Sequence, residues 1–270
     1  MKMYEIIDAH AHIYPGKIAE KATLAIGEFY DIKMQMPSGV SERLLTEGKS
    51  AGISRFIVHS VATKPEQVKS INAFIKSEID AHKEFIGFMT LHPNMTEEEV
   101  FSEVENCKKL GFHGVKLHPD FQKFDIDGEN AQKIYRAVSE MGENFPILLH
   151  TGDNRFEFSA PLKLSKMAKE YKNVSFIGAH FGGYRRWHES EVYLGLDNVY
   201  FDTCSSLPFI SPELAKSLIE KHGVEKFFFA TDFPMWDAKG EIERFLGINL
   251  TEKERENIFS KNVKNLLKIG

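Results

Sequence analysis

The sequence of 270 residues has only two cysteines, Cys107 and Cys204, which lie far apart and outside any CxxC pair. Small secreted domains held by disulfides have a dense and even set of cysteines, so we expect no disulfide framework. The first residues, MKMYEIIDAH, lack the apolar stretch that precedes a signal-peptide cleavage site. These two absences predict a soluble protein in a reducing, cytoplasmic setting.

Long apolar runs and an excess of one charge are also missing. No segment approaches the roughly 20 apolar residues of a membrane-spanning helix. The 34 basic and 39 acidic residues give a formal net charge of -5, without a basic stripe or a polybasic amphipathic run. We therefore expect neither nucleic acid nor a membrane surface as a partner. No Pro/Ser-rich linker divides the chain, so residues 1–270 are predicted to form a single domain.

The sequence does contain a regular alternation of two patterns. Runs rich in Val, Ile and Phe are typical of buried strands, and they lie at residues 5–14, 55–61, 85–93, 112–119, 146–152, 174–182, 199–206 and 227–234. Amphipathic stretches typical of helices lie at 64–83, 96–111, 128–142, 211–223 and 251–268. Eight alternations predict an α/β fold with a parallel sheet, most simply a closed (β/α)8 TIM barrel, with an open doubly wound sheet as the alternative.

Residues 15–40 have only weak periodicity. We expect a loop or short helices there, placed over the mouth of the barrel.

The first predicted strand has polar residues at every second position, Asp8, His10 and His12. Because side chains alternate between the two faces of a strand, all three are expected on one face, with the two histidines roughly 6–7 Å apart along it. Asp8 lies deeper and is expected to orient a histidine. Such groups cost free energy to bury unless something binds them together.

Histidines gather in the strand runs, mostly near the C-terminal ends, where a TIM barrel has its active site. Apart from His113 at the start of the fourth run, seven of the eleven histidines lie in these runs, namely His10, His12, His59, His92, His118, His150 and His180. Asp232 has the same position on the eighth run. His59 and His92 are expected to be hydrogen-bonded structural residues, and the other four histidines lie away from the strand ends. Barrel closure brings strands one, five, six and eight together, so a divalent cation with three or four N or O ligands is expected there.

Four motifs resemble those of the amidohydrolase superfamily: DAHAH at 8–12, LHTG at 149–152, GAHFGG at 178–183 and ATDFP at 230–234. The most similar branch is the amidohydrolase-related group, which includes enzymes of the aminocarboxymuconate-semialdehyde decarboxylase type. The terminal NIFSKNVKNLL resembles the closing helix of that branch.

The resemblance implies a centre of one or two divalent ions, most simply zinc, with manganese as the next candidate. The metal ligands that it implies are His10, His12, Lys116, His150, His180 and Asp232. Asp232 would bind the metal and take the proton of the attacking water, and His180 would bind a second metal or act as an acid or base. Lys116 resembles a lysine that is carbamylated to bridge two metals; the alternative is an ammonium that anchors a substrate carboxylate.

Side chains that follow the strands are expected to select the substrate. His118 shares the face of Lys116, Arg155 follows the fifth strand, and Arg185 and Trp187 follow the sixth. Arginine suits planar carboxylate or phosphate groups, so a small acidic or aromatic acid is the expected partner. A surface position is the alternative for each arginine.

Three functions remain open at this point. The first is a metal-dependent hydrolase, in which metal-activated water attacks a small amide, ester or lactone, and Lys116 favours it. The second is a non-oxidative metal-dependent decarboxylase on the same scaffold. The third is a metal-binding protein without catalysis. Assembly into a homo-oligomer is also left open.

Overall fold

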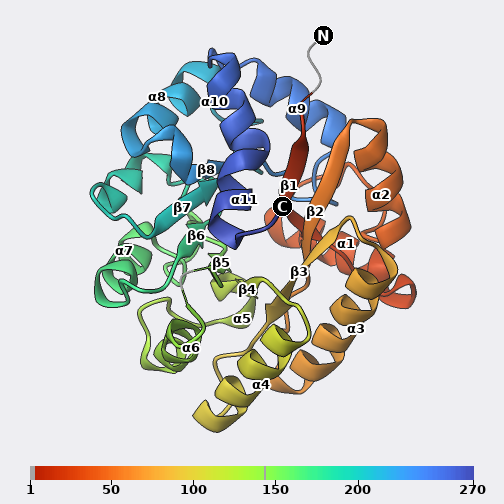
Figure 1. The fold of residues 1–270 in the computed structure, drawn as a ribbon, viewed down its shortest axis with the longest axis vertical. Coiled ribbons are helices and arrows are strands. Elements are labelled where there is room, and N and C mark those ends of the chain that lie inside the picture. Colours follow the sequence, from red (N-terminus) through yellow and green to blue (C-terminus); the bar gives the residue numbers. More distant parts are fainter. Residues whose placement is uncertain (1–3, 143) are drawn as a thin grey trace.

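The computed structural model describes residues 4–142 and 144–270. Its strands form one eight-stranded parallel sheet, in which each strand pairs with the next one along the chain (Figure 1). The strands are β1 (Ile6–His12), β2 (Ile53–His59), β3 (Phe85–Thr90), β4 (Gly114–Leu117), β5 (Ile147–Leu149), β6 (Phe176–Gly178), β7 (Val199–Asp202) and β8 (Phe227–Phe228).

Backbone hydrogen bonds join β1 to β8 and to the segment that follows it, and so nearly close the sheet. The N–H of Ala9 donates to the carbonyl of Phe229 at 2.9 Å, and the N–H of Asp232 donates to the carbonyl of His10 at 2.9 Å. The prediction of a (β/α)8 barrel is therefore confirmed, and the alternative of an open sheet is wrong.

Helices lie between the strands and form an outer ring (Figure 1). The helical elements are α1 (Gly16–Tyr30), α2 (Ser41–Ser50), η1 (Pro65–Gln67), α3 (Val68–Ala81), α4 (Glu97–Lys109), α5 (Pro119–Gln122), α6 (Glu129–Ser139), α7 (Pro161–Glu170), η2 (Trp187–Tyr193), α8 (Pro212–His222), η3 (Val224–Lys226), α9 (Ala238–Leu246), α10 (Glu252–Glu256), η4 (Asn257–Lys261) and α11 (Asn262–Leu267). Within the described ranges, no helix is both long and apolar enough to cross a membrane.

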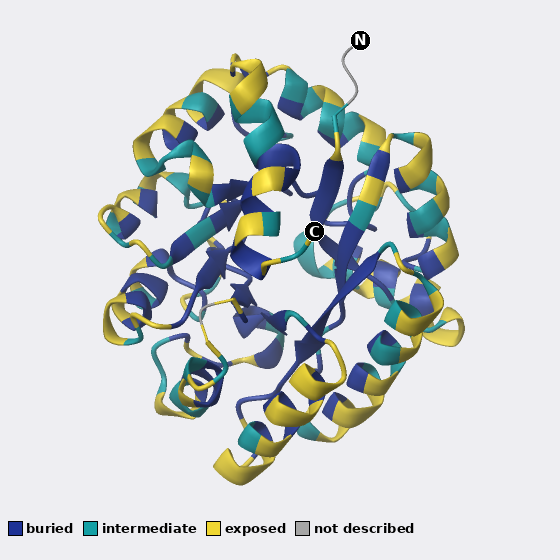
Figure 2. Ribbon diagram, viewed as in Figure 1, coloured by how far each residue is buried: buried dark blue, intermediate teal, exposed yellow. Residues whose placement is uncertain are grey.

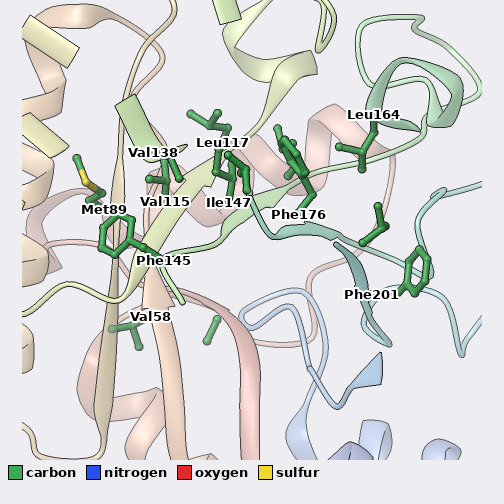
Figure 3. Close-up of a cluster of buried hydrophobic side chains, with 14 of the residues drawn as sticks. Val58, Met89, Val115, Leu117, Val138, Phe145, Ile147, Leu164, Phe176 and Phe201 are labelled. Atoms are coloured by element: carbon green, nitrogen blue, oxygen red, sulfur yellow. The ribbon is translucent and has the colours of Figure 1, made fainter. Parts of the chain in front are cut away.

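Two apolar layers hold the barrel together. The larger one lies between strands and helices, where side chains such as Val115, Ile147 and Phe176 are fully buried (Figure 3). Figure 2 shows the same arrangement as buried strands inside helices that expose one side. The smaller layer joins strand residues to Leu266 and Leu267 of α11, which crosses the centre of the view in Figure 1. These two layers are apolar, and the polar side chains of the barrel lie instead at the C-terminal ends of the strands.

The segment 15–40 is more regular than its sequence pattern predicts, because it contains the 15-residue helix α1. Ile26 and Tyr30 of α1, and Met34 just after it, line a cavity at the C-terminal ends of the strands. The segment therefore covers the barrel mouth, as expected.

Several strands are shorter than their sequence patterns predict. At His180, Phe181 and Asp232 the backbone turns into the left-handed region, with φ of 62°, 55° and 57°. This region is unfavourable for residues that carry a Cβ, and extended backbone cannot continue through these positions. Strained residues of this kind gather at functional sites, where the surrounding structure holds them in place.

Candidate metal centre

The predicted metal-binding residues line a single cavity at the C-terminal ends of the strands. Its free volume is about 20 Å³, enough for a water molecule or an ion. The wall includes all six predicted ligands, together with His118, Tyr30 and Tyr184.

Three ligand atoms in this cavity form a nearly equilateral triangle. The Nε2 atoms of His10 and His12 are 3.3 Å apart, and each lies 3.5 Å from Oδ1 of Asp232. Ligand atoms at 2.0–2.2 Å from one tetrahedral ion are themselves about 3.3–3.6 Å apart. The spacing of this metal triangle (His10, His12 and Asp232) therefore suits a divalent ion such as zinc.

The protonation states around the triangle also suit a cation. Burial lowers the pKa of His10 and His12 well below the usual value, so both rings are neutral at pH 7. Burial raises the pKa of Asp232 to about 6, and a hydrogen bond of 2.5 Å from Ser205 to its Oδ2 opposes that shift. Neutral imidazoles and an ionised carboxylate are the forms that bind metal.

Asp202, at the end of β7, orients His10 from behind. Its Oδ2 lies 2.7 Å from Nδ1 of His10, and its Oδ1 accepts the backbone N–H of His180 at 2.8 Å. A carboxylate partner on Nδ1 places the ring proton there and leaves Nε2 free for an ion. We did not predict Asp202 from the sequence, although it also ends a strand.

Lys116 lies beside the triangle, with Nζ 2.8 Å from Nε2 of His10. Its side chain is fully buried, and burial lowers its pKa to about 8. An amine with this pKa is partly neutral near pH 8 and can then react with carbon dioxide. Both predicted roles, a carbamate bridge and a carboxylate anchor, remain compatible with this position.

His150 and His180 form a second pair of rings in the cavity. Nδ1 of His150 lies 2.9 Å from Nε2 of His180, and Nε2 of His150 lies 3.4 Å from Oδ2 of Asp120. Ser159 donates to the same Asp120 oxygen at 2.7 Å. The six predicted ligands thus fall into two neighbouring groups, and this grouping is compatible with one ion or with two.

Asp8 does not lie on the same face of β1 as the two histidines, so the expectation of a shared face was wrong. Three steps along β1 from Asp8 to Ala11 face two steps along β2, so a β-bulge interrupts the alternation. Asp8 instead accepts hydrogen bonds from the backbone N–H of His10 at 3.1 Å and of Thr231 at 2.9 Å. It orients His10 through the backbone and ties β1 to the segment that carries Asp232.

His59 also differs from the expectation of a hydrogen-bonded structural residue. It is fully buried, and neither ring nitrogen has a hydrogen-bond partner among the described residues. Its ring lies against His12, with centroids 4.4 Å apart, and His10, His12 and His59 together could hold an ion. His92, in contrast, accepts the backbone N–H of Asn94 at 3.1 Å, in keeping with a structural role.

His118 is the one predicted substrate residue that lies on the cavity wall. Its ring stacks on His150 at 4.0 Å between centroids, and its Nε2 lies 2.8 Å from the hydroxyl of Tyr30. Tyr30 was not predicted, because the weak periodicity of its helix gave no sign that a side chain would enter the barrel.

The other three predicted substrate residues do not line the cavity. Arg155 pairs with Asp153 at 2.7 Å and lies over the ring of Tyr30. Arg185 is exposed and covers the ring of Phe209 at 3.6 Å from its centroid. Trp187 donates its indole N–H to the carbonyl of His180 at 3.1 Å.

Comparison with known proteins identifies the family of this chain. The sequence profile of a family described as amidohydrolase matches residues 7–269. The chain belongs to the amidohydrolase family. This confirms the resemblance seen in the sequence and the prediction of an enzyme. No curated protein sequence matches this amidohydrolase chain.

Solved structures of the same fold cover nearly the whole chain. An uncharacterised TIM-barrel protein from Bordetella bronchiseptica has a TM-score of 0.81 at 17% identity, over 98% of each chain. A 5-carboxyvanillate decarboxylase from Sphingomonas paucimobilis has a TM-score of 0.78 at 13% identity, and the match covers 99% of this amidohydrolase and 100% of the decarboxylase. A dihydroxybenzoic acid decarboxylase from Polaromonas sp. JS666, with manganese and the inhibitor 2-nitroresorcinol, has a TM-score of 0.77 at 16% identity. The match covers 98% of this amidohydrolase and 97% of the decarboxylase. At these identities the similarity shows the shared fold.

We predict that the amidohydrolase purified without chelator contains at least about one divalent ion per chain. Elemental analysis after incubation with zinc or manganese measures the occupancy. His12→Ala is expected to lower it strongly, because one corner of the metal triangle is lost. The matched control is His188→Ala, whose side chain is 79% exposed. Wild-type protein that stays metal-free would contradict the metal triangle.

We also predict that metal affinity falls as the pH drops through about 6. Below the pKa of Asp232, which is about 6, the carboxyl group is protonated in the ion-free protein. It must then lose its proton to bind, so the affinity decreases toward roughly tenfold per pH unit. Lys116 titrates at a higher pH, since its pKa is about 8. Competition with a chelator measures this pH dependence. If Asp232→Asn showed the same decrease in metal affinity near pH 6, the decrease could not come from protonation of Asp232.

Proposed function

We propose that this amidohydrolase is a metal-dependent, non-oxidative decarboxylase of a small aromatic carboxylic acid. The reaction replaces the carboxylate by a proton on the same carbon and releases carbon dioxide. It needs a site that holds the carboxylate and a neighbouring oxygen, and an acid that delivers the proton.

The position of Asp232 carries the proposal. Oδ1 lies on the metal triangle, while Oδ2 accepts the hydroxyl of Ser205 at 2.5 Å, and Trp236 in turn donates to Ser205 at 2.9 Å. These contacts fix the carboxyl group beside the place where the substrate carboxylate would bind. Oδ2, which lies off the metal triangle, is the atom from which Asp232 would pass a proton to the substrate carbon.

The other groups on the wall suit an acidic aromatic substrate. Lys116 would place an ammonium beside the carboxylate in its uncarbamylated form. The hydroxyl of Tyr30, next to His118, is a donor for a second substrate oxygen. A divalent ion at the triangle would supply Lewis-acid stabilisation of the negative charge. Zinc and manganese are both candidates, and the manganese in the Polaromonas decarboxylase supports the second.

Two of the similar structures are decarboxylases of substituted benzoic acids, which supports this reading over hydrolysis. Hydrolysis of an amide, ester or lactone is the second candidate. The observation in its favour is Lys116 at 2.8 Å from His10, where a carbamate would complete a site for two ions.

We predict that the metal-loaded enzyme releases carbon dioxide from at least one hydroxylated benzoic acid. A panel of such acids is assayed for carbon dioxide in parallel with esters, lactones and amides assayed for hydrolysis. Turnover of a lactone or ester without decarboxylation would support the hydrolase instead. Absence of turnover across both panels would support a metal-binding protein without catalysis.

For the accepted substrate, we expect Asp232→Asn to lower kcat by roughly 10²–10⁴-fold, the usual contribution of a positioned acid or base. The asparagine keeps the size and one oxygen ligand, so part of the metal is retained. His180→Asn is also expected to lower the rate, whereas His188→Ala serves as the control. A wild-type rate in Asp232→Asn at full metal occupancy would remove Asp232 from the mechanism.

A further inference from the structure

An apolar groove of about 620 Å³ lies beside the candidate metal centre, between α1 and α3. One wall is a stripe on α1 made by Ile18, Ala22, Ala25, Ile26 and Phe29, which recur at helical spacing. The opposite wall includes side chains from α3 and from the loop after β2, namely Val61, Ile71 and Phe74. The side chain of Ile18 is 51% exposed, so this stripe is not covered by the chain itself.

The groove adjoins the cavity of the metal triangle. His12, Ile26 and Phe121 line both spaces. The cavity itself has a free volume of about 20 Å³, too small for the body of any organic acid. The volume of the groove, in contrast, is in the range of about 300–1,000 Å³ that is typical of small-molecule sites.

We propose that this groove binds an apolar substituent of the carboxylic acid whose carboxylate is held at the metal triangle. The proposal rests on the proposed function and narrows its substrate class to acids with an apolar side group. His12 forms the inner end and is only 7% exposed, so a slender ligand reaches it more readily than the surface of another protein. Exposed polar residues of the η1–α3 segment, Gln67 and Ser70, form the outer rim.

The test uses the manganese-loaded full chain and a series of acids from benzoate to 4-butylbenzoate, with binding measured by titration calorimetry. In the wild type, Kd is expected to fall about fourfold for each added methylene that is buried. In Ala25→Trp, the indole fills the groove away from the triangle. The Kd of benzoate should then stay within about twofold of the wild-type value, while the gain along the series is lost.

Leu24→Trp is the matched control, because Leu24 is the neighbouring residue, is 63% exposed and does not line the groove. In this control, Kd should decrease from benzoate to 4-butylbenzoate as it does in the wild type. Ser70→Trp fills the groove from the opposite wall and repeats the test if Ala25→Trp does not fold, as checked by circular dichroism.

Three results would overturn the proposal. The first is a flat series, meaning a wild-type Kd that does not change from benzoate to 4-butylbenzoate. The others are a wild-type decrease of Kd in both groove variants, and no binding by any of the acids. A flat series together with a dimer that the groove variants dissociate would assign the groove to a second copy of the chain. The binding series needs no turnover. Missing decarboxylation with an intact series therefore contradicts the proposed function alone, and a flat series in an active decarboxylase contradicts the groove alone.

Discussion

The hydrogen bond from the N–H of Asp232 to the carbonyl of His10 is the contact on which the site depends. It joins the segment after the last strand to the first strand, so closure of the barrel and formation of the metal triangle are one event. Asp8 strengthens the same junction through Thr231. A barrel that failed to close here would leave His10 and His12 without their carboxylate partner.

Burial makes this arrangement useful and costly at the same time. The rings at the strand ends are neutral because charged imidazoles are poorly solvated there, and His59 has two buried ring nitrogens without a described hydrogen-bond partner. The carboxylate of Asp202 holds the ring proton of His10 on Nδ1, the nitrogen that faces away from the metal triangle. A divalent ion would satisfy the remaining lone pairs, so the protein without metal is expected to be strained at this end of the barrel.

The sequence predicted features that depend on local patterns and fold closure, and it missed those that depend on irregular backbone. Alternation of strands and helices predicted the barrel, and polar residues at strand ends predicted the cavity wall. Strict alternation misplaced Asp8, because a bulge in β1 has no clear signal in the sequence. Tyr30 was missed because the apolar stripe of α1 faces the groove and not the core, which weakens the helical pattern. Arg155 pairs with Asp153 two residues before it, but its position over the ring of Tyr30 is a long-range contact that only tertiary structure reveals.

Anomalous diffraction from crystals of the manganese-loaded protein tests the central claim most directly. The account predicts an ion about 2.0–2.2 Å from Nε2 of His10, Nε2 of His12 and Oδ1 of Asp232. If Lys116 is carbamylated, a second ion should lie about 3.5–4 Å away, with extra density on Nζ, near His150 and His180. A single ion beside an unmodified Lys116 would rule out the two-ion form in that preparation. An anomalous peak that lies elsewhere, or none at the triangle at full metal occupancy, would contradict the account.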